Sequence, residues 1–103
     1  IEHAVNVAGE EHVSIGTDGT LSTVALTPEF VQSFTENVAR RKAAGIAAPQ
    51  ESDDGYLFAN DLNTPRCFEQ LADRLSLRGH SDDRIEMILG ANLLRVFGAA
   101  WDS

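Results

Sequence analysis

The chain has 103 residues, which is enough for one small domain and no more. Hydrophobic residues make up 43% of it, and 16 acidic against 8 basic residues give a formal charge of -8. Nucleic acids and anionic membrane surfaces are therefore poor candidate partners, since both bind proteins through Lys and Arg.

The cysteine and hydropathy patterns exclude further classes. Cys67 is the single cysteine, so an internal disulfide and a multi-cysteine zinc module are both excluded. No run of 18 apolar residues occurs, so the sequence predicts no transmembrane helix.

The first 17 residues predict a helix end followed by a short strand. Residues 1–9 carry apolar side chains at helical spacing and stop at Gly9, which suggests a helix whose beginning lies upstream. Residues 12–17 alternate β-branched with small or polar side chains and predict a strand. The chain offers only 56–59 as a weak second strand. Because a buried strand needs a hydrogen-bonded neighbour, we expect this one to pair with something outside the chain.

Asp18 stands at the end of the predicted strand and before Gly19. The carboxyl end of a strand is where α/β barrels and open sheets place their chemistry, so Asp18 is the candidate catalytic residue. The alternative is a turn-forming aspartate whose side chain accepts hydrogen bonds from nearby backbone amides.

Three helices are predicted after this turn. Thr27-Pro28 begins a helix over about 28–44, Thr64-Pro65 begins one over about 65–78, and Ser81 caps one over about 82–98. Residues 46–63 between the first two predict an exposed connection held by Tyr56, Leu57 and Phe58.

Within the last predicted helix, three positions call for an explanation. Gly90 is costly in a helix interior by about 1 kcal/mol, so we expect it to permit close packing. Asn92 and Arg95 share one face and either bind neighbouring backbone or meet solvent.

The histidines do not predict a metal site. His3, His12 and His80 are far apart in sequence, and no zinc-binding helix motif occurs. On a straight strand His12 and Asp18 would lie roughly 20 Å apart, too far to share an ion.

Three ordered motifs resemble the membrane dipeptidase (renal dipeptidase-like) family. They are the helix end IEHAVNVAG at 1–9, the strand HVSIGTDG at 12–19, and the terminus GHSDDRIEMILGANLLRVF at 79–97. Family members often have Asp-Phe-Asp-Gly where this chain runs directly from Asp18 to Gly19. Residues 21–64 are also longer than in the animal enzymes, so the chain resembles a bacterial-type variant.

The resemblance implies a fold, an activity and a cofactor. It implies that residues 1–103 are a single segment, the C-terminal part of a (β/α)8 TIM barrel of the metal-dependent, amidohydrolase-like hydrolase type. That segment would contain the last strand and a mostly helical C-terminus, so the chain itself is expected to be mainly α within an α/β fold. The parent protein would be a dipeptidase with two zinc ions whose ligands lie outside this chain.

The resemblance also implies a role for Asp18. It matches the family's strand-end aspartate, which handles proton transfer beside the metal site. The expected partners are a dipeptide substrate and the remainder of the barrel, and a second copy of the protein is the further candidate because relatives in this family often dimerise. The chain alone is expected to be inactive. The alternative is a small, acidic, helical interaction module in which 65–78 and 82–98 form a hairpin and no catalysis occurs.

Overall fold

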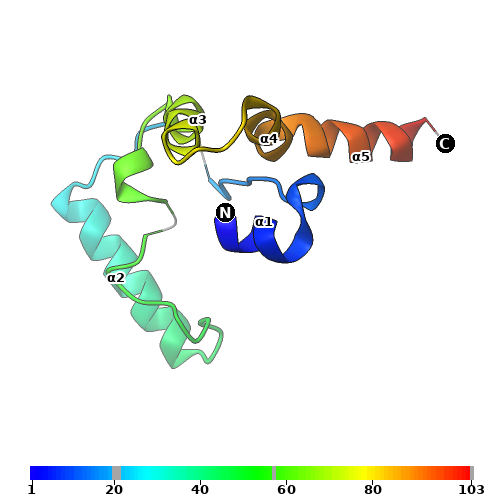
Figure 1. Cartoon of the computed structure of the whole chain (residues 1–103). Helices are drawn as coiled ribbons and strands as arrows, with labels where there is room; N and C mark the ends of the chain where they lie inside the picture. Colours follow the sequence, from blue (N-terminus) through cyan, green and yellow to red (C-terminus); the bar gives the residue numbers. More distant parts are fainter. Residues whose placement is uncertain (20–21, 57, 103) are drawn as a thin grey trace. The chain divides into compact units, whose positions relative to one another are not determined.

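The computed structural model describes residues 1–19, 22–56 and 58–102, and these are mainly helical (Figure 1). They form two compact units, one of residues 1–17 with 66–103 and one of residues 18–65. We call them the terminal unit and the central unit. The expectation of a mainly α chain is confirmed. No helix of the described residues is long and apolar enough to cross a membrane.

The expected strand at 12–17 is not formed. His12 ends the 3-10 helix η1 (Glu10–His12), and the backbone beyond it is extended from Val13, with φ -114° and ψ 130°. A strand requires a neighbouring strand, and none exists in the described residues, which include 56 and 58–59 but not Leu57. The alternation of side chains still holds, because Val13 is buried and Ile15 packs beside it.

The core of the terminal unit joins its two ends. Helix α1 (Glu2–Ala8) contributes Val5, the extended segment contributes Val13, and the helical turn η3 (Met87–Ala91) contributes Ile88. Ile88 has no exposed surface. Leu75 of α3 (Cys67–Leu77) and Ile85 of α4 (Asp82–Glu86) are also buried.

The predicted helix over 82–98 is interrupted. It divides into α4, the π-helical turn η3 and α5 (Asn92–Trp101), and Ser81 caps it by accepting a hydrogen bond from Arg84 N at 3.2 Å. Gly90 has non-helical angles, φ 175° and ψ -31°, inside η3. A Cβ added there would meet no atom within 4 Å, so the interpretation of Gly90 as a close-packing residue is wrong. It lies at a kink instead.

The helix predicted over 65–78 begins later than the Thr64-Pro65 pattern indicates. Helix α3 starts at Cys67, after a turn, and its N-cap residue Arg66 makes no side-chain capping bond. A Thr-Pro pair is equally compatible with a turn, and the turn is what the structure contains here.

The central unit is built on helix α2 (Pro28–Ala43) and the connection that follows it. Thr27 caps α2 as its sequence predicts, accepting from Phe30 N at 3.1 Å. Tyr56 of the connection packs on Phe30 and Phe34, with ring centroids 5.9 and 5.0 Å away. The short 3-10 helix η2 (Asn60–Leu62) precedes Asn63, which exchanges two 2.7 Å hydrogen bonds with the Val24 backbone.

Candidate functional site

Asp18 lies where the extended segment ends, as the first residue of the central unit. Its φ is 51°, and among the described residues it is the one non-glycine residue with positive φ. This left-handed conformation costs an L-residue roughly 1–2 kcal/mol, although aspartate tolerates it better than most. Such local strain is concentrated at functional sites, so it marks Asp18 for attention.

The Asp18 side chain is exposed. Within residues 1–19, 22–56 and 58–102, no hydrogen bond or ion pair engages its carboxylate. A turn-forming aspartate uses its side chain to accept from local amides, and that bond is not made here. The carboxylate therefore remains available to a ligand or to a reacting group.

The described residues do not by themselves fit a zinc site. No group of three His, Cys, Asp or Glu side chains in that part of the chain is placed to hold a metal ion. His3 and His12 are exposed on α1 and η1, and His80 is engaged elsewhere. Among the residues that the structure describes, none therefore joins Asp18 in a metal-binding group.

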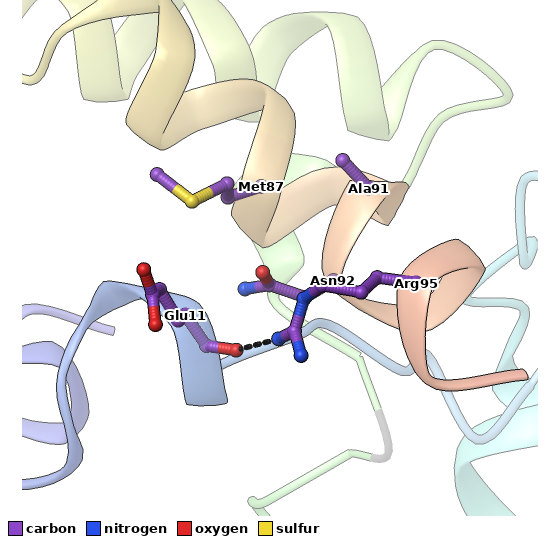
Figure 2. A pocket seen from close by; sticks show the side chains of 5 residues that line it. All are labelled: Glu11, Met87, Ala91, Asn92 and Arg95. Carbon is purple, nitrogen blue, oxygen red and sulfur yellow. Dashed lines mark hydrogen bonds between the residues drawn. The ribbon is translucent and has the colours of Figure 1, made fainter. Parts of the chain in front are cut away.

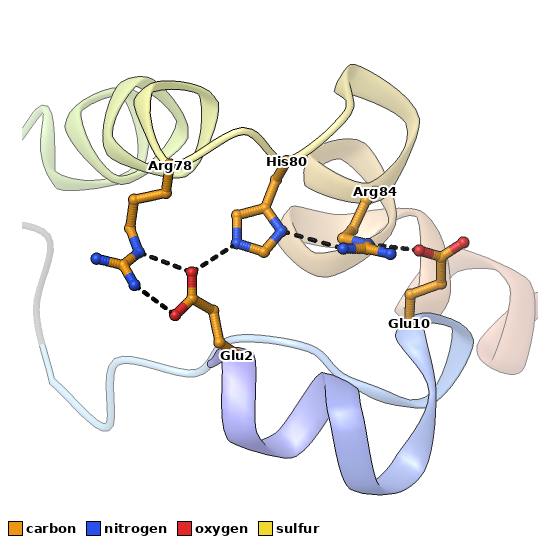
Figure 3. A network of polar contacts seen from close by, with 5 residues as sticks. All are labelled: Glu2, Glu10, Arg78, His80 and Arg84. Carbon is orange, nitrogen blue, oxygen red and sulfur yellow. Dashed lines mark hydrogen bonds and ion pairs between the residues drawn. The ribbon is translucent and has the colours of Figure 1, made fainter.

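His80 belongs to a polar network that the sequence analysis missed (Figure 3). Glu2 accepts hydrogen bonds from Arg78 Nε at 2.7 Å, Arg78 Nη2 at 2.6 Å and His80 Nε2 at 3.0 Å. The Arg78 guanidinium first, and His80 second, lower the pKa of Glu2 from 4.5 to about 2. The network fastens α1 to the end of α3 and the loop before α4.

Arg84 extends this network and defines the tautomer of His80. Its Nη1 lies 3.3 Å from His80 Nδ1, and its Nε donates to Glu10 at 2.5 Å. Because arginine can only donate, Nδ1 accepts and Nε2 carries the hydrogen that reaches Glu2. The bonds to Glu2 and Glu10 join residues 74 to 78 apart, so no local pattern in the sequence reveals them.

Asn92 and Arg95 fasten α5 to the backbone of residues 10–13, and Figure 2 shows the Arg95 bond to Glu11. Asn92 Nδ2 donates to the Glu10 carbonyl at 2.7 Å and to the Val13 carbonyl at 2.9 Å, and Arg95 Nη2 donates to the Glu11 carbonyl at 2.6 Å. Of the two alternatives that the sequence left open, binding to neighbouring backbone is confirmed. These bonds hold residues 10–13 at the start of the extended segment.

Comparison with protein families, with curated proteins and with solved structures finds no match to this chain. The resemblance to the membrane dipeptidase family therefore depends on the three sequence motifs.

Proposed function

We propose that this chain is the C-terminal part of a zinc-dependent dipeptidase and that Asp18 is its proton-transfer residue. The observation that carries the proposal is an extended stretch, residues 14–16, without backbone hydrogen bonds among the described residues, which is followed closely by the unengaged carboxylate of Asp18. No backbone hydrogen bond is made at Ser14, Ile15 or Gly16 in the described part of the chain. In the parent protein these groups would pair with a neighbouring strand, and residues 12–17 would form the last strand of a (β/α)8 barrel.

The proposed role of Asp18 follows from the chemistry of peptide hydrolysis. The attacking water must lose a proton and the leaving amine must gain one, and a carboxylate within hydrogen-bond reach can do both in turn. The exposed, unengaged Asp18 side chain meets the requirement that the group be accessible. Zinc and its ligands belong to other segments of the parent protein in this proposal, because the described residues do not hold the metal.

The test is Asp18→Asn in the parent protein, with dipeptide hydrolysis and zinc content measured together. Loss of general acid-base catalysis should lower kcat by about 10²- to 10⁴-fold while zinc stays bound. The matched control is Asp53→Asn, which changes an exposed acid of the central unit and should leave kcat unaltered. Near-normal turnover of the zinc-loaded Asp18→Asn protein would refute the proposed role.

The chain by itself should not hydrolyse dipeptides. Purified residues 1–103 supplied with zinc are expected to show only background hydrolysis, since their described residues lack a metal site. Activity above background, abolished by Asp18→Asn, would overturn the view that the ligands lie elsewhere.

A second candidate function is the acidic, helical interaction module. The observation that favours it is the apolar surface of α5, on which Leu94 is 76% and Trp101 79% exposed. A solvent-facing apolar stripe on a helix is typical of a surface that docks into a partner. The mass of the native gene product separates the two candidates. A product several times larger than 11.2 kDa, with metal-ligand motifs upstream, favours the peptidase, and one of about this size favours the module.

A further inference from the structure

A pocket of about 300 Å³ lies in the terminal unit, among η1, η3 and α5 (Figure 2). Glu11 lines it from η1, Met87 and Ala91 from η3, and Asn92 and Arg95 from α5. The proposed function uses none of these side chains. Two of the five come from the turn that contains the kink at Gly90.

The pocket carries two opposite charges that do not neutralise each other. Glu11 and Arg95 both line it and both are exposed, yet within the described residues no ion pair of 4.0 Å or less joins the Glu11 carboxylate to the Arg95 guanidinium. Arg95 directs Nη2 to the Glu11 backbone carbonyl, which leaves its other nitrogens without a protein partner in that part of the chain. One anionic and one cationic group thus face the same space.

Asn92 adds a further acceptor. It is only 4% exposed, and both hydrogens of its Nδ2 are used on the Glu10 and Val13 carbonyls. Its Oδ1 has no hydrogen-bond partner in the described part of the chain. Because this oxygen reaches solvent, it is free to accept a hydrogen bond from a ligand. Met87 and Ala91 supply an apolar wall, and Met87 can adapt its shape to a guest.

We propose that this pocket binds a free α-amino acid with an apolar side chain. The ammonium group would donate to the Glu11 carboxylate and Asn92 Oδ1, the carboxylate would accept from Arg95, and the side chain would pack on Met87 and Ala91. A simple anion could pair only with Arg95, and a simple cation only with Glu11. A zwitterion can form an ion pair with each of them. A volume of about 300 Å³ is at the lower end for ligand pockets, which selects a small guest.

This inference does not rest on the proposed peptidase function. The pocket and its charges belong to residues 11 and 87–95, and Asp18 takes no part in them. Loss of catalysis in Asp18→Asn and loss of amino-acid binding in a pocket variant are therefore separate outcomes.

The test is a titration of the ¹⁵N-labelled chain with L-leucine, followed by amide chemical shifts. Saturable shifts are expected around the pocket, with a Kd on the order of 1 mM. Leucinamide, which lacks the carboxylate, and 4-methylpentanoate, which lacks the ammonium, should each bind at least about tenfold more weakly. The variants Glu11→Gln and Arg95→Gln should weaken leucine binding by a similar factor. The controls Glu36→Gln and Arg40→Gln, two exposed residues of α2, should not.

Several results would overturn the proposal. They are no saturable shifts with leucine, shifts confined to residues outside the pocket, and equal affinity for leucine and its two truncated analogues. Arg95→Gln also removes the bond to the Glu11 carbonyl and could unfold the terminal unit, which the amide spectrum would show. In that case Glu11→Gln is the variant that tests the binding site. That change leaves the backbone carbonyl in place, and unaltered leucine binding by the folded Glu11→Gln chain would refute the assignment.

Discussion

The terminal and central units are held together in different ways. Of the described residues, the buried hydrophobics Val5, Val13, Leu75, Ile85 and Ile88 all belong to the terminal unit, and the central unit has Val38 alone. The terminal unit also has hydrogen bonds between residues about 80 apart, whereas the Asn63–Val24 bonds of the central unit span 39 residues and its Arg41–Glu51 ion pair spans 10. The terminal unit is thus held together by contacts between its two ends of the chain, and the central unit is one helix whose preceding and following segments are joined by Asn63 and Val24.

The difference coincides with the sequence motifs. The family-like stretches at 1–9 and 79–97 lie in the terminal unit, and the longer 21–64 segment lies in the central unit. Asp18 is the first residue of the central unit and directly follows residues 1–17 of the terminal unit. In the proposed enzyme, the terminal unit would carry most of the sequence that resembles the family, and the central unit the segment that differs from it.

The largest effect should come from the core of the terminal unit. Ile88→Ala removes a side chain with no exposed surface and is expected to cost about 3 kcal/mol. The single Trp101 reports on the terminal unit and the single Tyr56 on the central unit, so one urea titration follows both. The Trp101 transition should shift to lower urea while the Tyr56 transition stays. An equal shift of both would show that the units unfold together, and Val38→Ala is the matched control for the central unit.

A somewhat smaller effect is expected at the buried amide. Asn92→Asp replaces the Nδ2 donor with an oxygen that cannot donate, so the Glu10 and Val13 carbonyls lose their partner and face a carboxylate. Loss of such buried bonds costs about 2 kcal/mol. The same urea titration measures it through Trp101, and Asn37→Asp on the exposed face of α2 is the control. Unchanged stability would mean that the bonds contribute little to closing the terminal unit.

The smallest effect should be seen in the pH dependence of the terminal unit. The pKa of Glu2 is lowered to about 2 in the folded chain against 4.5 for the free group, mainly by Arg78. Its contribution to stability is therefore complete above about pH 4.5 and is lost as the pH falls from there toward 2. Glu2→Gln should flatten the stability profile in this window, and added salt should shrink the difference because the pair is exposed. An unaltered profile would contradict the lowered pKa, and Glu86→Gln is the control.

The features that were predictable from the sequence depend on interactions between residues a few positions apart. The caps of Thr27 and Ser81 follow from side-chain oxygens three residues before an open backbone amide, and the structure contains both. The inward direction of Val13 and Ile15 follows from the two-residue period of extended backbone. The kink at Gly90 and the late start of α3 were not predictable, because helix geometry at those points depends on neighbours that a local pattern does not include.

The sequence by itself determined the approximate location of the helices, the charge of -8 and the position of Asp18 after an alternating segment. Only the tertiary structure decided the environment of Asp18, which has a positive φ and an unengaged carboxylate at the end of an extended segment. It also decided the partners of Asn92, Arg95, Glu2 and His80. The reason is that helix caps and periodicity act within a few residues, whereas strand pairing and long-range hydrogen bonds depend on what the folded chain brings alongside.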